Sequence, residues 1–174
     1  YVPSRTLAAH PHVELIAFSP SPAGRETARL FSACGSTVLA LTRSGRAEPF
    51  PSSSFSLPST GDPSGTIPSA YYSTQQREQR LAFFARCDVV VNTLPDSAAT
   101  RRCFGDDEFR GMKGDAIYVN VGRGSTTDHE ALVEALKAEP KEGDAVGTLR
   151  IGAACLECVP FSSSHCSPLT RARS

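Results

Sequence analysis

The 174-residue sequence lacks net charge, because 18 lysines and arginines balance 18 aspartates and glutamates. A balanced chain has no broad positive field, so we expect neither nucleic acid nor a membrane surface as its partner. Its apolar runs are far shorter than the roughly 20 residues that a membrane-spanning helix needs. The sequence has no apolar signal segment after Tyr1–Arg5 and no initiator methionine. We therefore expect a chain without a secretory signal that begins within a longer protein.

The sequence also lacks the cysteine spacing of a disulfide scaffold. Cys34, Cys87 and Cys103 are scattered through an ordinary α/β pattern, which indicates reduced thiols in a cytoplasmic protein. A loose metal-ligand spacing occurs near the end, at Cys155, Cys158, His165 and Cys166. Two further ligands at proper spacing are missing, so we expect no zinc site.

Apolar runs alternate with helical patterns along the chain, which predicts the α/β class. Strands are expected at 13–18, 37–41, 88–93, 116–119 and within 146–156, and helices at 22–34, at 75–86, from 106 or 107, and after Asp128 as far as Pro140. The first strand, helix and second strand form a βαβ unit, the start of a dinucleotide-binding fold. We predict a Rossmann-like, doubly wound parallel sheet in one truncated domain at 13–157. Outside it lie an N-terminal remnant at 1–12 and an irregular tail at 158–174, and 47–73 is an irregular insertion.

The turn after the first strand lacks two glycines of the G-x-G-x-x-G pattern, whose positions here read Ser19, Ser21 and Gly24. A Cβ at either of the first two positions obstructs the approach of a pyrophosphate, and Pro20 and Pro22 remove two N–H donors. A weakened dinucleotide site and a plain strand-to-helix turn therefore remain open as interpretations. If the turn binds a dinucleotide, its contacts are Ser21, Ala23, Gly24 and Arg25.

The second strand is followed by no acidic residue, whereas an NAD site usually has Asp or Glu there for the ribose 2′-hydroxyl. The segment reads Thr42, Arg43, Ser44, Gly45, Arg46. Arg43 and Arg46 could accept a 2′-phosphate, which favours NADP over NAD as the cofactor. The alternative is that both are solvated surface arginines. Thr42, Arg43 and Ser44 are the candidate cofactor contacts of this segment.

One stretch carries a candidate catalytic residue: Asn120–Gly124, which follows the apolar run Ala116–Val119. A short buried strand ends there in an arginine, Arg123, flanked by glycines. In an open α/β sheet, ligands bind in the crevice beyond the carboxyl ends of the strands. A cation at that place is well positioned to hold a carboxylate.

The half of the chain from Asp88 to Leu136 resembles the nucleotide-binding domain of the D-isomer-specific 2-hydroxyacid dehydrogenases, a family that includes glyoxylate/hydroxypyruvate reductases and phosphoglycerate dehydrogenase. The matching residues are 88–91, Leu94, Pro95, Thr100, Arg101, Glu108, Phe109, Met112, Lys113, 118–124, Asp128 and 130–132. Ala23–Arg29 matches the first helix of the family more loosely. The resemblance implies an NAD(P)-dependent oxidoreductase that reduces a 2-oxo acid such as glyoxylate or hydroxypyruvate.

Several roles follow from the resemblance. Arg123 is implied to grip the carboxylate of the substrate and polarise its carbonyl, with a bidentate fork suited to a 2-oxo acid. Leu94 and Pro95 are implied to line the nicotinamide end of the cofactor, with Thr100, Val121 and Gly122 as further contacts. Relatives dimerise through this domain, which implies a homodimer for the complete protein.

The sequence departs from the family after residue 156. Glu157 and Cys158 replace the pattern of the family, and the Pro-His pair that supplies its catalytic acid does not follow. His165 sits in Ser-rich sequence, so we do not assign it as the acid. A chain that is incomplete, or whose last segment does not continue the family sequence, explains this. Loss of the acid removes roughly 10²–10⁴-fold of catalysis. The alternatives are therefore a catalytically incompetent, cofactor-binding or dimerising fragment, and a nonfunctional fragment.

Overall fold

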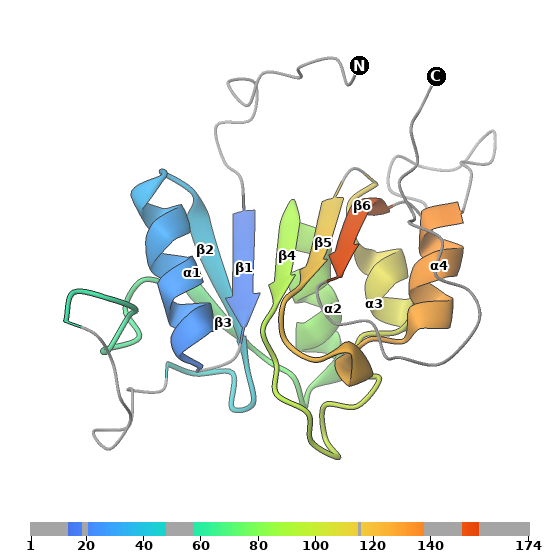
Figure 1. Ribbon diagram of the computed structural model, residues 1–174, viewed down its shortest axis with the longest axis horizontal. Coiled ribbons are helices and arrows are strands. Elements are labelled where there is room, and N and C mark those ends of the chain that lie inside the picture. Colours follow the sequence, from blue (N-terminus) through green and yellow to red (C-terminus); the bar gives the residue numbers. More distant parts are fainter. Residues whose placement is uncertain (1–13, 19–20, 48–57, 115, 138–150, 157–174) are drawn as a thin grey trace.

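The computed structural model describes residues 14–18, 21–47, 58–114, 116–137 and 151–156 (Figure 1). In these residues six parallel strands form one sheet in the order β3-β2-β1-β4-β5-β6. The strands are β1 Glu14–Phe18, β2 Thr37–Thr42, β3 Ala70–Ser73, β4 Val89–Asn92, β5 Ala116–Asn120 and β6 Ile151–Leu156. The helices are α1 Pro22–Ala33, α2 Arg77–Arg86, α3 Asp106–Gly111 and α4 His129–Lys137, with a 3₁₀ turn, η2, at Gly124–Thr126. This strand order is that of the doubly wound Rossmann fold, which confirms the predicted fold class.

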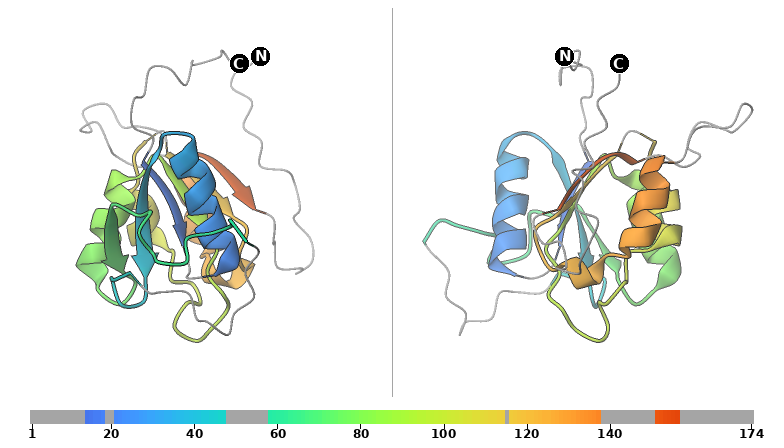
Figure 2. Two further views of the ribbon diagram at one scale, coloured as in Figure 1. Left: turned by 90° about the vertical axis from the view of Figure 1, so that its left-hand side faces the viewer. Right: turned by 45° about the vertical axis from the view of Figure 1, so that its right-hand side comes forward.

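Helices cover the two faces of the sheet unequally. Helix α1 lies on one face, and α2, α3 and α4 lie on the other (Figure 2). The strand order reverses between β1 and β4, so this pair is the topological switch point of the sheet. All strands run in the same direction, and their carboxyl ends form the lower edge in Figure 1. Any ligand of such a sheet is expected at that edge, near β1 and β4.

Helix α1 begins and ends where the sequence predicts. The Ser21 hydroxyl accepts a hydrogen bond from the Gly24 N–H at 3.2 Å, Pro22 is the first helical residue, and Gly35 follows the helix with φ of 84°. The helical spacing of the sequence predicts an inward face made of Ala23, Thr27, Leu30, Phe31 and Cys34. That prediction is wrong, because Leu30 is half-exposed and Ala23 is exposed. The residues buried in this helix are Gly24, Arg25 and Ala28. Small residues at positions 24 and 28 leave room for close packing of helix on strand.

Strand β3 corrects the expectation that 47–73 is irregular throughout. Ala70–Ser73 pairs in parallel with β2 from Leu39 to Thr42. The strand has only four residues, too few for an alternating pattern to be recognised, and its pairing partner lies about 30 residues earlier. Tertiary pairing rather than local pattern therefore decides this element. The segment 48–57 lies outside the described residues.

The core lies between the sheet and helices α2, α3 and α4. Four aromatic side chains form an edge-to-face series, with ring centroids 5.3 Å apart for Phe84–Phe104, 6.3 Å for Phe104–Tyr118 and 5.2 Å for Phe109–Tyr118. Pairs in this geometry add about 0.5–1.5 kcal/mol each beyond the burial of their area. This packing holds the face of the sheet that carries Tyr118 rigidly against the helices.

The helices of this layer agree with the sequence in position and differ in one detail. The pattern of α2 predicts Leu81, Phe84 and Ala85 on the inward face. Phe84 is buried as predicted, but Ala85 is exposed and Phe83 is buried in its place. The pattern of α4 places Ala131, Leu132, Ala135 and Leu136 on one face. Of these, Leu132 and Ala135 are buried. Among the residues that the structure describes, no helix combines the length and the apolar character that crossing a membrane would require.

Candidate functional site

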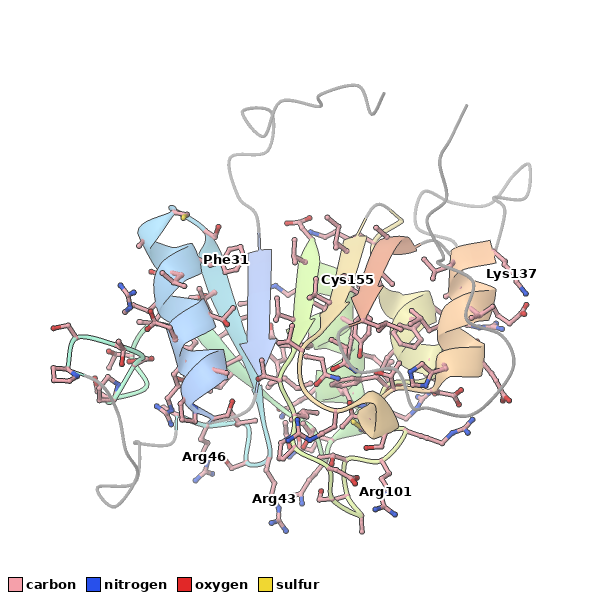
Figure 3. The ribbon with its side chains drawn as sticks, in the orientation of Figure 1. Phe31, Arg43, Arg46, Arg101, Lys137 and Cys155 are labelled. Carbon is pink, nitrogen blue, oxygen red and sulfur yellow. The ribbon has the colours of Figure 1, made fainter. Side chains whose placement is uncertain are left out.

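The turn after β2 presents two arginines at the carboxyl edge. The buried Thr42 hydroxyl donates to the Arg46 carbonyl at 3.2 Å and accepts from the Gly45 N–H at 3.1 Å. Gly45 has φ of 70°, a conformation that other residues rarely adopt. The Thr42 hydroxyl thus fixes the turn, and Arg43 and Arg46 remain exposed. Figure 3 shows both side chains projecting beyond the edge of the sheet. Ser44, the third candidate there, is also exposed.

The turn that opens α1 is braced by the loop at 58–67. Arg25 is 7% exposed, and its guanidinium donates to the Asp62 carbonyl. The Asp62 carboxylate in turn accepts from the Thr66 and Ile67 N–H groups. Arg25 is therefore held toward this loop, while Ser21 caps the helix and Ala23 is exposed. Binding of a pyrophosphate by these residues stays a prediction.

Glu26 adds a second link between α1 and the same loop. Its carboxylate accepts from Arg29 and from the Gly61 N–H at 2.6 Å. The hydrogen bond from Arg29, followed by that from Gly61, lowers the pKa of Glu26 to about 2. The Glu26 carboxylate is consequently charged at neutral pH.

Strands β4 and β5 each end in an asparagine whose side-chain oxygen accepts a hydrogen bond from the N–H group two residues later. Asn92 accepts from the Leu94 N–H at 2.9 Å, and Asn120 accepts from the Gly122 N–H at 3.0 Å. The two asparagines are paired in register and are both buried. The side-chain oxygens therefore fix the direction in which each chain leaves the sheet.

The amide nitrogens of the same two asparagines reach into the loop after β5. Asn92 donates to the Thr126 hydroxyl at 2.7 Å and to the Tyr118 hydroxyl at 3.1 Å. Asn120 donates to the Thr127 hydroxyl at 3.0 Å and to the Arg123 carbonyl at 3.2 Å. Sequence reasoning missed these positioning residues. The available signal was an asparagine at the end of each of two neighbouring apolar strands.

Gly122 is the point of closest approach between the two loops. A Cβ there would lie 2.7 Å from the Leu94 carbonyl oxygen, 2.9 Å from the Leu94 nitrogen and 2.9 Å from the Thr93 carbonyl carbon. Only glycine fits this spacing. Leu94 is buried, whereas Pro95 and Val121 are exposed at the edge.

Arg123 lies exposed at the end of β5, with Nη1 donating to the Gly122 carbonyl at 3.0 Å. Asp96, from the loop after β4, is nearby. A hydrogen bond from Arg101, another from Ser125, and the charges of Arg101 and Arg123 outweigh desolvation and lower the pKa of Asp96. The Asp96 carboxylate of one loop and the Arg123 guanidinium of the other thus lie at this edge. Figure 3 places Arg101 there as well.

Thr100 closes the loop after β4 on itself. Its hydroxyl donates to the Pro95 carbonyl at 2.6 Å and accepts from the Ser97 N–H at 2.9 Å. The structure thus brings most of the predicted residues to one edge, in three groups: Thr42, Arg43 and Ser44 after β2; Leu94, Pro95 and Thr100 after β4; and Val121, Gly122 and Arg123 after β5. Arg25 differs, because its side chain turns to the loop at 58–67.

Residues 21–147 match the family model for the NAD binding domain of D-isomer specific 2-hydroxyacid dehydrogenases. The chain belongs to this family. It is 45% identical over 51 residues to glyoxylate/hydroxypyruvate reductase B of Klebsiella pneumoniae (strain 342), a match that covers 29% of this chain and 16% of that protein. The protein of the same name from Salmonella newport (strain SL254) is 46% identical over 50 residues, covering 29% of this chain and 15% of that protein.

Solved structures of 2-hydroxyacid dehydrogenases share the fold. Phosphoglycerate dehydrogenase from Lactobacillus plantarum superposes with a TM-score of 0.64 at 20% identity, over 87% of this chain and 40% of that one. A D-isomer specific 2-hydroxyacid dehydrogenase from Xanthobacter autotrophicus Py2, solved with NADPH and MES, superposes with a TM-score of 0.63 at 22% identity. That match covers 97% of this chain and 43% of the other. The chain therefore spans less than half the length of these dehydrogenases.

A nicotinamide dinucleotide is the cofactor that the family model implies, and the described residues fit it in two respects. The buried Thr93 hydroxyl, at the end of β4, has no hydrogen-bond partner in the described part of the chain. The exposed arginines Arg43 and Arg46 offer positive charge at the end of β2. A buried donor and a basic edge are features that an anionic, oxygen-rich dinucleotide satisfies.

Cysteines do not form a metal cluster in the part of the dehydrogenase domain that the structure covers. Cys34, Cys103 and Cys155 are free thiols. The buried Cys87 thiol donates to the Phe83 carbonyl. No group of three His, Cys, Asp or Glu side chains there could hold a metal ion. Burial raises the pKa of Cys103 to about 12, so this thiol stays protonated. The remaining members of the loose spacing, Cys158, His165 and Cys166, lie outside the described residues.

We predict that the stability of the protein depends on pH through His129, at the start of α4. Burial lowers the pKa of His129 below the ordinary value of 6.5. The negative charge of Asp128 opposes this shift, and the positive charge of Arg102 adds to it. The Nε2 atom is buried and has no hydrogen-bond partner in the described residues. The neutral form is favoured by folding, so its contribution is complete above pH 6.5 and declines as the pH falls toward the lower folded value. We expect the melting temperature of the wild type to fall more steeply than that of His129→Gln between about pH 7.5 and 5.5. Parallel calorimetric scans check this, and equal slopes would contradict it.

Proposed function

We propose that this chain is the cofactor-binding part of an oxidoreductase that reduces a 2-oxo acid, such as glyoxylate or hydroxypyruvate, to the 2-hydroxy acid. The observation that carries the proposal is Arg123, exposed at the carboxyl end of β5 and held there by the Asn120 turn and Gly122. A guanidinium fork can bind a carboxylate in two parallel hydrogen bonds, which fixes the orientation of a small acid. The whole protein is proposed to be a cytoplasmic homodimer, with residues 13–157 as the domain.

A bound nicotinamide would supply the hydride. The residues proposed to hold the dinucleotide are Ser21, Ala23, Gly24, Arg25, Thr42, Arg43, Ser44, Leu94, Pro95, Thr100, Val121 and Gly122. NADP is favoured over NAD, because two exposed arginines and no carboxylate follow β2. Arg123 then binds and polarises the 2-oxo acid beside the nicotinamide end of the cofactor. Leu94 and Pro95 line that end.

A second candidate, a catalytically incompetent fragment that binds cofactor or dimerises, is favoured by two observations. His129 is the only histidine among the described residues, and its Nε2 atom is buried. Ile117 and Val121 expose apolar side chains, 41% and 40% respectively, on or just beyond β5. Binding measurements rather than turnover are therefore the first test, because they do not require a catalytic acid.

Calorimetric titration with NADPH and with NADH tests the cofactor proposal. We expect saturable binding that is tighter for NADPH. The double variant Arg43→Ala/Arg46→Ala should lose about 10- to 100-fold in NADPH affinity, since hydrogen bonds to charged groups contribute about 1.5–3 kcal/mol. Its NADH affinity should change less than threefold or so, because NADH lacks the 2′-phosphate. Saturation with neither nucleotide would contradict both the enzyme and the cofactor-binding proposals.

Arg123→Gln tests the proposed role in holding the acid. With the chain saturated by NADP⁺, binding of oxalate, an inert dianion that resembles the substrate, should weaken by about tenfold or more. Arg110→Gln is the matched control: it removes the same charge from an exposed arginine of α3 that pairs with Asp106 at 2.7 Å. Oxalate affinity that survives in Arg123→Gln, or that falls equally in both variants, would remove Arg123 from the proposed role.

A further inference from the structure

Thr93 is the residue at the carboxyl edge whose polar group the fold leaves unsatisfied. Its side chain is 7% exposed, and Oγ1 has no hydrogen-bond partner in the described residues. The neighbouring backbone is fixed, because the Leu94 N–H is held by Asn92 and the Thr93 carbonyl carbon faces Gly122. The backbone therefore cannot shift to bring the Thr93 hydroxyl to another protein group.

The register of the sheet places Thr93 at the switch point. Phe18, the last residue of β1, pairs with Asn92, so Thr93 lies immediately beyond the end of β1. The Asn92 side chain points to the face that holds Tyr118, where it makes its hydrogen bond. Successive residues of an extended chain point to opposite faces, so the side chain of Thr93, one residue beyond β4, is directed away from the face of Tyr118. Helix α1 covers that opposite face (Figure 2). The opening of α1 and the Thr93 hydroxyl thus lie on the same face of the sheet, at its carboxyl edge.

A buried hydroxyl without a partner destabilises a folded protein, and valine has nearly the same shape without that cost. A threonine at this place is therefore explained best by a partner that arrives with a ligand. In a doubly wound sheet the pyrophosphate lies at the opening of the first helix, and the adenosine ribose lies at the end of β2. The remaining half of a dinucleotide must then extend across β1 toward β4.

We propose that the Thr93 hydroxyl donates a hydrogen bond to an oxygen of the ribose–phosphate in the nicotinamide half of the cofactor. This inference rests on the proposed function. It assigns a role to a residue outside the predicted set of contacts, and it makes Thr93 a determinant of how the nicotinamide end is oriented relative to Arg123.

The test compares Thr93→Val with Thr93→Ser by calorimetry, using NADPH and 2′,5′-ADP, a fragment that carries the adenosine end and no nicotinamide. Thr93→Val should bind NADPH about fivefold more weakly than the wild type, the loss expected for one hydrogen bond. Thr93→Ser, which keeps the hydroxyl, should stay within about twofold. All three proteins should bind 2′,5′-ADP equally. The melting temperature of ligand-free Thr93→Val should be no lower than that of the wild type.

Three results would overturn the inference. Thr93→Val that binds NADPH as tightly as the wild type shows that the hydroxyl does not contact the cofactor. If Thr93→Val weakens the binding of NADPH and of 2′,5′-ADP by the same factor, the substitution acts through the protein structure. A wild-type chain that saturates with neither NADPH nor NADH overturns the proposed function itself, a failure separate from the first two. Thr93→Ala supplies the same comparison if the valine variant does not fold.

Discussion

Gly122→Ala is expected to destabilise the domain by about 3 kcal/mol, because an added methyl group has no space between the loops that follow β4 and β5. Its carbon would lie 2.7 Å from the Leu94 carbonyl oxygen and 2.9 Å from two further backbone atoms. All three atoms belong to the backbone and not to a flexible side chain, so the loops must move apart. Since Leu94 and Arg123 lie on these loops, saturable NADPH binding should be lost as well.

Urea unfolding followed by circular dichroism measures this effect. Gly111→Ala is the matched control, because a Cβ at the end of α3 would meet only the Leu81 carbonyl oxygen at 3.9 Å, an ordinary contact. Its stability should lie within about 0.5 kcal/mol of the wild type, as for other uncrowded surface positions. A Gly122→Ala variant that unfolds at the same urea concentration as Gly111→Ala would show that the loops separate at little cost.

Asn92→Leu is expected to cost about 4 kcal/mol, because it leaves several buried groups unsatisfied at once at roughly 1–3 kcal/mol each. Asn92 is 2% exposed. Its oxygen accepts from the Leu94 N–H, and its nitrogen donates to the hydroxyls of Thr126 and Tyr118. Leucine fills a similar volume and replaces none of these hydrogen bonds, so the change reports on the network rather than on a cavity.

Asn120→Leu should produce a loss of similar size, because Asn120 makes the matching set of contacts at the end of β5. Asn92→Asp separates the two functions of the side chain, since it keeps the acceptor for Leu94 and removes the donor. Equilibrium unfolding of the three variants provides the comparison. A loss below about 1 kcal/mol for Asn92→Leu would show that water replaces the network, and the positioning role would then be rejected.

The sequence predicts the elements whose patterns are local. Helices α1 and α4 have a cap, a periodic apolar face or a clear stop, and β1, β4 and β5 are continuous apolar runs. β3 escapes prediction because a four-residue strand has no pattern of its own and exists through its pairing with β2. The inward face of α1 escapes for a related reason. Arg25 is buried by a contact with Asp62, 37 residues away.

The site divides in the same way. Arg123 is recognisable because glycines flank it at the end of an apolar strand, and the arginines after β2 are recognisable because no acid accompanies them. The roles of Asn92 and Thr93 are not visible in the sequence. Asn92 acquires its role from hydroxyls that lie 26 and 34 residues further along the chain. The role proposed for Thr93 comes from its buried hydroxyl, which has no hydrogen-bond partner in the described residues.

The matching turns at the ends of β4 and β5 have a mechanical consequence. Both asparagines are hydrogen-bonded to the segment from Tyr118 to Thr127. Leu94 and Arg123, on the loops after β4 and β5, therefore belong to one rigid unit. Under the proposed function, the spacing between the nicotinamide and a bound 2-oxo acid is therefore set during folding, and no binding energy is consumed in bringing the two loops together. A closing motion in the proposed enzyme would bend the chain elsewhere and move these two loops together as one rigid unit.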